Sequence, residues 1–165
     1  MLSFENILDD FIESGKLQIA IIGKGKSIDS IDSKKLDEFY VINLNDSEAI
    51  YAGDICITYY DWAKENIQYL GNKCKFYVTD SPWNDERNYV ILDRISENPE
   101  EILPIQMRFF DEKTYLENVV LITALKIANW ISNKSRRRLD VILLGFDFEI
   151  SSGLSSKFNS DDLHN

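Results

Sequence analysis

The stretch LQIAIIGKGKS, residues 17–27, constrains the fold of this chain more than any other stretch. Its apolar run 19–22 breaks into the loop Gly23-Lys24-Gly25-Lys26-Ser27. A continuous apolar run of this length, bounded by glycine, is typical of a strand buried on both faces. Two glycines at the carboxyl end of such a strand allow a sharp turn and a close backbone approach to a ligand. The stretch predicts a strand of a parallel sheet, followed by a loop of the kind that holds nucleotides or phosphates.

The loop matches known phosphate-binding motifs only in part. It lacks the third glycine of G-x-G-x-x-G and the spacing of G-x-x-x-x-G-K-[ST], so a plain structural turn is the alternative interpretation. Lys24 and Lys26 could neutralise a diphosphate, and backbone N–H groups around Gly25 could form an anion-binding nest. Two solvated lysines on a turn would have the same sequence.

Apolar segments with strand character alternate with helical patterns along the rest of the chain. Strands are expected at 18–22, 39–42, 55–58, 75–78 and 139–144, with an edge strand at 89–92. Helices are expected at 3–15, 63–70 and 113–133, with a short turn or helix at 47–51. The alternation predicts a single α/β domain over residues 1–148, with a mostly parallel sheet flanked by helices. Residues 149–165 are rich in Ser and Asp and predict a polar, mobile tail.

Length, composition, net charge and cysteine content restrict the class of protein. A chain of 165 residues that is 44% hydrophobic can bury a sizeable core as one domain. The net charge of −10 argues against a nucleic-acid partner, because phosphate contacts need a basic surface. Cys56 and Cys74 have no C-x-x-C neighbour, which favours a reducing compartment. With no signal-peptide pattern and no membrane-length apolar run, we expect a cytoplasmic protein without a transmembrane segment, and a homo-oligomer remains open.

Polar side chains follow the apolar run of each strand. They are Lys24 and Ser27, then Asn43, Asn45 and Asp46, then Tyr59, Tyr60 and Asp61, then Asp80 and Ser81, and finally Asp147. Because the carboxyl ends of parallel strands meet at one edge of a sheet, these side chains are expected to face one crevice. Loops after buried strands are often polar in any case, so about half of these residues are expected to be caps and turns.

Individual residues in this set suit particular roles. The amides of Asn43 and Asn45 suit a base, a ribose or sugar hydroxyls, with Asx-turn capping as the alternative. Asp147 could act as a base, a metal ligand or a turn cap. His164 is the only histidine and could be a general acid or base, or simply a solvated residue near the chain end. No zinc-spaced cluster, G-x-S-x-G or H-E-x-x-H occurs, so no metal site is predicted.

Taken in order, these segments resemble a known superfamily. IIGKGKSIDSID followed by VINLND is similar to the opening of the Rossmann-like superfamily that contains bacterial family-42 sialyltransferases, in which a G-N-G-P-S-L loop precedes a strand ending in Asn. The DUF115 group, with motility-associated glycosyltransferases and archaeal 6-hydroxymethylpterin diphosphokinase, shares this pattern. ALKIANW and LLGFDF are similar to the group's helix, strand and G-x-D-F block. The resemblance spans residues 18–60 and 113–148.

The resemblance implies a nucleotide-sugar substrate such as CMP-sialic acid, a glycan acceptor and a role in surface-glycan biosynthesis. Gly23, Gly25 and Ser27 would line the donor phosphates, Asn43 and Asn45 would meet nucleotide or sugar, and His164 would be the base. The full expected nucleotide-binding set is Gly23, Lys24, Gly25, Lys26, Ser27, Asn43, Asn45, Asp46, Tyr60, Asp80 and Ser81, with Asp147 and His164 as catalytic candidates.

Two alternatives accompany this interpretation. Pyrophosphoryl transfer to a pterin-like alcohol would need ATP and Mg²⁺, with Asp46, Asp80 or Asp147 as metal ligands. A degenerate, non-catalytic interaction domain attached to a glycan enzyme is the other. Lys24 and Lys26 replace the Asn and Pro of the family loop, and Glu117-Asn118 replaces a small-residue contact, where a carboxylate would repel phosphate. The sequence also stops soon after GFDF, so the chain is either a fragment or lacks the acceptor half of the site.

Overall fold

The computed structural model describes residues 2–84, 86–109, 111–147 and 153–158. The strands are β1 (Gln18–Ile22), β2 (Tyr40–Leu44), β3 (Ile55–Ile57), β4 (Phe76–Thr79), β5 (Tyr89–Ile91) and β6 (Asp140–Leu144). The α-helices are α1 (Phe4–Ser14), α2 (Ser33–Leu36), α3 (Asp61–Ile67), α4 (Ile105–Arg108) and α5 (Val120–Ser135). Three short 3₁₀ helices are η1 (Lys26–Ser30), η2 (Asn45–Ala49) and η3 (Pro99–Glu101).

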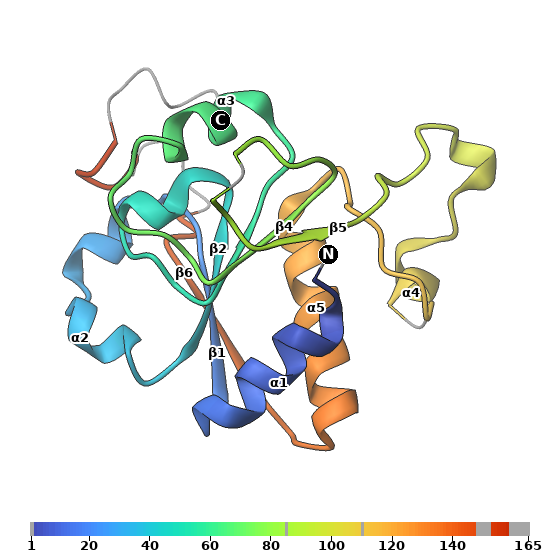
Figure 1. Ribbon diagram of the computed structural model, residues 1–165, viewed down its shortest axis with the longest axis horizontal. Coiled ribbons are helices and arrows are strands. Elements are labelled where there is room, and N and C mark those ends of the chain that lie inside the picture. The colour runs from blue at the N-terminus through green and yellow to red at the C-terminus, as the bar shows by residue number, and fades with distance from the viewer. Residues whose placement is uncertain (1, 85, 110, 148–152, 159–165) are drawn as a thin grey trace.

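The strands form one sheet in the order β5-β4-β3-β2-β1-β6, and every pairing in it is parallel (Figure 1). This confirms the predicted single-domain, Rossmann-like α/β fold. The five strands β1 to β5 lie side by side in chain order, and β6 then returns to the free edge of β1. The order therefore reverses between β1 and β6, where open α/β sheets commonly bind ligands beyond the carboxyl ends of their strands.

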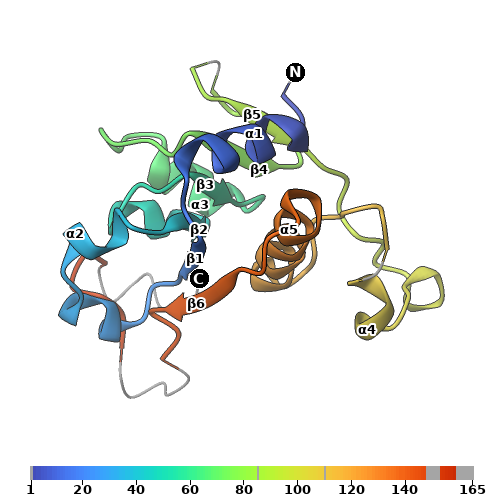
Figure 2. The ribbon, with the colours of Figure 1, turned by 90° about the horizontal axis from the view of Figure 1, so that it is seen from below.

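Helices cover both faces of the sheet (Figures 1 and 2). On one face α1 and α5 pack together against β1 and β2, and their buried core includes Phe11, Ile21 and Ile127. On the other face η1 and α2 bury Ile28 and Leu36 against β1 and β2. Because β1 is buried on both sides, its residues read as an unbroken apolar run.

The long helix begins later than the sequence predicted. The expected helix 113–133 has its first turn at Val120, because Leu116 before it forms a bridge with Arg94, in the chain after β5. Leu116 donates its N–H to the Asp93 carbonyl at 2.9 Å, and Ile95 donates to the Leu116 carbonyl at 2.9 Å. Leu116 is thus buried through a tertiary bridge, which overrides the helical spacing of this segment.

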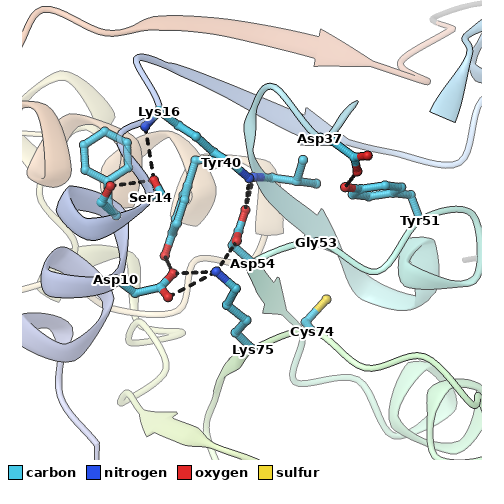
Figure 3. Close-up of polar contacts among 12 residues, drawn as sticks. Asp10, Ser14, Lys16, Asp37, Tyr40, Tyr51, Gly53, Asp54, Cys74 and Lys75 are labelled. Carbon is cyan, nitrogen blue, oxygen red and sulfur yellow. Dashed lines mark hydrogen bonds and ion pairs between the residues drawn. The ribbon is translucent and has the colours of Figure 1, made fainter. Parts of the chain in front are cut away.

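At the amino edge of the sheet, a polar cluster joins α1 to the strands (Figure 3). The buried Asp54 carboxylate accepts the Val41 N–H at 2.8 Å and pairs with Lys75 at 3.0 Å. Asp10 of α1 pairs with the same lysine at 3.1 Å and accepts the Tyr40 hydroxyl at 3.0 Å. Burial alone would lower the pKa of Lys75, but its bonds to the two carboxylates outweigh burial and raise that pKa. The cluster fixes α1 to the sheet at the end opposite the predicted crevice.

Across the described ranges, no helix is both long and apolar enough to cross a membrane.

Candidate functional site

The predicted glycine loop lies at the switch point between β1 and β6, and its glycines are needed for contact with the β6 loop. The Gly25 N–H donates to the Gly145 carbonyl at 2.7 Å. A Cβ on Gly25 would lie 2.7 Å from the Asp147 carboxylate, and one on Gly23 would lie 2.7 Å from the Gly145 carbonyl oxygen. Close packing between two loops of the chain therefore explains both glycines without a ligand.

An aspartate occupies the anion-binding donors of this loop. The Asp147 carboxylate accepts the Ser27 N–H at 2.7 Å and also accepts the Ser27 hydroxyl. These two hydrogen bonds lower the pKa of Asp147, because they favour its ionised form. Asp147 thus caps the turn by satisfying donors that the sequence had suggested for a phosphate.

Lys24 and Asp46 form a buried ion pair beside the loop. Lys24 Nζ lies 3.0 Å from Asp46 Oδ1, and both side chains are almost fully enclosed. The ammonium group also lies over the rings of Trp62 and Phe158, at 5.0 and 4.7 Å from their centroids. Lys24 is therefore an interior residue in this structure, whereas Lys26 is exposed.

Residues 153–158, part of the expected polar tail, lie against the same loop. Leu154 forms an antiparallel bridge with Gly25, and the Ser155 N–H donates to the Lys24 carbonyl at 2.7 Å. The Ser155 hydroxyl donates to Asp29 at 2.5 Å, and the Ser156 N–H donates to the same carboxylate at 2.9 Å. The described part of the tail therefore packs directly against this loop.

Asn43 lies beneath the carboxyl edge and has no exposed surface. Its amide nitrogen donates to the Tyr51 carbonyl at 2.8 Å, and its amide oxygen accepts the Gly53 N–H at 2.9 Å. Its neighbour Ser47 donates to the Ile22 carbonyl at 2.9 Å, which links the end of β2 to the end of β1. In this structure the Asn43 side chain therefore holds the backbone of Tyr51 and Gly53 in place from a buried position.

Asn45, by contrast, is partly exposed and adopts a left-handed backbone conformation with φ of 51°. This conformation is tolerated by asparagine better than by most residues, and it turns the chain from β2 into η2. Its side-chain oxygen accepts the Thr58 hydroxyl at 3.3 Å. Among the described residues the amide nitrogen has no hydrogen-bond acceptor, so it is available to a ligand.

Asn45 and Tyr60 line a pocket of about 420 Å³ at this edge. The other side chains of its wall are those of Leu44, Trp62, Asn118, Val119, Val120 and Leu121. The rings of Tyr60 and Trp62 are stacked, with centroids 5.8 Å apart and planes 19° from parallel. The Tyr60 hydroxyl donates to the Asn118 carbonyl at 3.1 Å, which joins the aromatic wall to the chain before α5. The pocket thus combines a flat aromatic surface with two side-chain amides.

The amino end of α5 opens onto this pocket. Val119, at the N-cap position, provides no side-chain acceptor, and no acidic residue lies in the first turn. The N–H groups of Val120 and Leu121 belong to the orphan donors that every helix carries at its start. With the positive end of the helix dipole, these donors favour an anionic group.

Glu117 does not place its charge in the pocket, although it precedes Asn118. Its carboxylate is 2% exposed and accepts Arg108 Nε at 2.9 Å, with Lys126 Nζ 3.6 Å away. The Glu117 N–H donates to the Thr123 hydroxyl at 2.9 Å. The two cations offset the carboxylate that the sequence suggested would repel a phosphate.

Asp80 and Ser81 follow β4 as predicted but do not line the pocket. Asp80 pairs with Lys64 at 2.9 Å and with Arg94 at 2.5 Å, and the Ser81 hydroxyl accepts from Lys64 at 3.1 Å. Burial would raise the pKa of Asp80, but its bonds to the two cations lower the pKa overall. Asp46, Asp80 and Asp147 are each engaged separately, and the described ranges contain no group of three or more acidic, Cys or His side chains that could hold a metal.

Comparisons of the chain with protein-family models, with curated proteins and with solved structures gave no match. The sialyltransferase and DUF115 resemblance therefore stays a sequence hypothesis. His164, its suggested base, lies outside the described residues.

Sequence reasoning missed Trp62 and did not assign Asn118 to the site. Trp62 directly follows the polar run Tyr59-Tyr60-Asp61 at the end of β3, and an aromatic residue in that position is a usable signal. Asn118 could not be found in the same way, because the sequence placed it inside a helix. Only the later start of α5 brings it to the pocket.

Proposed function

We propose that this domain binds a nucleotide or nucleotide-sugar in the pocket at the amino end of α5. The observation that carries the proposal is that the uncapped start of α5 shares one pocket with the Tyr60–Trp62 stack. A phosphate suits the helix amides and a planar base suits the aromatic rings. The amides of Asn45 and Asn118 suit ribose or sugar hydroxyls.

This placement moves the expected phosphate position away from the glycine loop. The Gly145 carbonyl and the Asp147 carboxylate already accept the N–H groups of Gly25 and Ser27, and Lys24 is paired with Asp46. The ligand would still lie at the carboxyl edge of a parallel sheet, as the fold class favours. With the sequence resemblance, this supports a nucleotide-sugar-binding domain in surface-glycan biosynthesis.

Binding is better supported than transfer. The described lining of the pocket contains no carboxylate and no imidazole that would deprotonate an acceptor hydroxyl. Burial and a hydrogen bond with Tyr60 raise the pKa of the neighbouring Tyr59, which makes that phenol a poor base at neutral pH. Sugar transfer would therefore need a base from outside this described lining, such as His164.

Thermal unfolding with a panel of nucleotides tests the proposal. CMP, CMP-sialic acid, UDP-sugars and ATP with and without Mg²⁺ should be compared at millimolar concentration. A ligand at 100 times its Kd adds about 2.7 kcal/mol of stability. For a chain of this size each kcal/mol raises Tm by about 2–4 °C. Stabilisation by CMP-type ligands supports the nucleotide-sugar function, and stabilisation by ATP only with Mg²⁺ supports pyrophosphoryl transfer.

A pair of isosteric variants locates the binding site. Asn118→Asp adds a carboxylate at the pocket without changing its shape, and should abolish the ligand-dependent rise in Tm through repulsion of the phosphate. Asn72→Asp makes the same change in net charge at an exposed position and should keep the rise. If the ligand raises Tm equally in the two variants, the ligand binds elsewhere on the protein. If no nucleotide stabilises the wild type, the non-catalytic interaction domain is the remaining interpretation.

A further inference from the structure

Residues between β5 and α5 form an arm that leaves the sheet and returns beside α5 (Figures 1 and 2). The arm carries η3 and α4, and a parallel bridge between Arg94 and Leu116 closes its base. The arm and α5 enclose a cleft of about 370 Å³. Apolar side chains of Ile95, Ile102 and Tyr115 line it together with the cationic side chains of Arg94, Arg108 and Lys126.

Lys126 is the notable member of this lining, because it is a buried cation with an incomplete set of partners. It is only 4% exposed. Its ammonium nitrogen lies 3.6 Å from Glu117 Oε1, which is longer than a hydrogen bond. The same oxygen accepts Arg108 Nε at 2.9 Å. Among the described residues no other carboxylate lies within ion-pair distance of Lys126, so two cations share one acceptor.

Arg94 and the acidic side chains of the cleft already have hydrogen-bond or ion-pair partners. Arg94 pairs with Asp80 and lies over the ring of Tyr59, 4.6 Å from its centroid. The acidic residues at the rim are exposed and hydrogen-bonded. Glu101 accepts the Ser96 hydroxyl at 2.7 Å, and Asp111 accepts the Lys113 N–H at 3.1 Å. Lys126 is therefore the buried cation of this cleft that makes no hydrogen bond to a carboxylate among the described residues.

We propose that this cleft binds the carboxylate of a small organic acid with an apolar body. The carboxylate would lie on Lys126 Nζ, and the body would lie along Ile95, Ile102 and Tyr115. One cation that shares its carboxylate with Arg108 matches the single charge of a carboxylate ligand better than the nearly double charge of a phosphate monoester. Such a ligand supplies the missing acceptor of a buried ammonium group, whose isolation is otherwise costly.

This site is separate from the nucleotide pocket. Lys126 lies on α5 beyond the first helical turn, and the two cavities have no lining residue in common. Lys126 and Asp111 also line an adjoining cavity of about 560 Å³, which gives room for a larger acid. The inference therefore does not rest on the proposed nucleotide function.

Titration with benzoate, followed by ¹H–¹⁵N correlation spectra, tests the proposal. Benzamide serves as a neutral probe of the same shape. Benzoate should bind saturably and shift the signals of Ile95, Tyr115 and Lys126, whereas benzamide should bind more than about tenfold more weakly. Absence of saturable benzoate binding, or equal binding of the two probes, overturns the proposal.

Two variants with opposite expected effects locate the charge. Lys126→Met should weaken benzoate binding more than about tenfold, while Lys35→Met, at an exposed position, should leave it unchanged. Glu117→Gln removes the carboxylate that competes for Lys126 and Arg108, and should tighten benzoate binding. The correlation spectrum of each variant reports its folding. If one variant does not fold, the other decides, and unchanged affinity in either overturns the proposal.

Discussion

The Asp147 carboxylate accepts the Ser27 N–H at 2.7 Å, across 120 positions of the sequence. This contact joins the loop after β1 to the loop after β6, the two strands at which the sheet order reverses. Because the Asp147 carboxylate occupies the Ser27 donors, these donors are not free to bind a ligand at the switch point. The contact also gives a measurable dependence of stability on pH.

Asp147→Asn should reduce the free energy of unfolding at neutral pH, with a difference that depends on pH. The folded-state pKa of Asp147 is lowered, so its contribution is present above the unfolded-state pKa and is lost as pH falls through the folded value. Urea midpoints of wild type and variant should therefore converge in strongly acidic solution. Asp9→Asn, at an exposed residue, serves as the control. A difference that stays constant with pH would contradict the assignment.

Lys24→Met should destabilise the protein by about 3–5 kcal/mol, because it leaves the buried Asp46 carboxylate without its cation. The double variant with Asp46→Asn should cost less than the sum of the two single variants. Denaturant unfolding of all four proteins measures the coupling, which we expect at about 1–3 kcal/mol. Lys26→Met, at the neighbouring exposed lysine, should change stability by less than about 0.5 kcal/mol. If the loss of unfolding free energy in the double variant equals the sum of the losses in the two single variants, the ion pair is not formed.

Glu48→Gln should become relatively more stable than the wild type as pH rises. Glu48 is buried, and burial raises its pKa although Tyr77 donates to it at 2.8 Å. A carboxyl with a raised folded-state pKa stabilises the fold at low pH and loses this contribution as pH rises from its unfolded value, near 4.5, through its folded value. Urea unfolding of both proteins from pH 4 to pH 8 measures the trend, and parallel pH profiles would rule it out.

Tyr40→Phe should destabilise the protein by about 1.5–3 kcal/mol, because the Tyr40 hydroxyl donates to the Asp10 carboxylate from a buried position (Figure 3). The ring and its edge contact with Phe11 are kept, so the change removes only the hydroxyl and its hydrogen bonds to Asp10 and to the Ile7 carbonyl. Tyr69→Phe removes a hydroxyl from a ring that is 85% exposed and should have no measurable effect. Equal unfolding midpoints for the two variants would show that the hydrogen bonds of the Tyr40 hydroxyl contribute nothing.

The sequence was sufficient for the parts of the fold that depend on local pattern. Unbroken apolar runs predicted buried parallel strands, and Gly15 predicted the end of α1, where it adopts φ of 67°. The predicted start of α5 was wrong, because Leu116 has helical spacing but forms a bridge with Arg94 instead. A local pattern contains no information about such a distant partner.

The candidate site was less predictable for the same reason. Asn43 and Asn45 look equivalent in the sequence, yet one side chain is enclosed and the other faces the pocket. In a strand buried on both faces, polarity does not show which asparagine reaches the surface. Lys24 reads as a solvated loop residue, and only the packing of Asp46, Trp62 and Phe158 around it makes it an interior cation.

The position of β6 has a consequence for how the protein folds. β1 pairs with β2 on one side and with β6 on the other, so residues 140–144 must be present before β1 has both neighbours. During synthesis, a nascent chain that has released β1 to β5 exposes the backbone N–H and C=O groups along one side of β1 to other chains. Closure by β6 is a long-range contact and therefore slow. Premature termination before residue 140 should yield an aggregation-prone product.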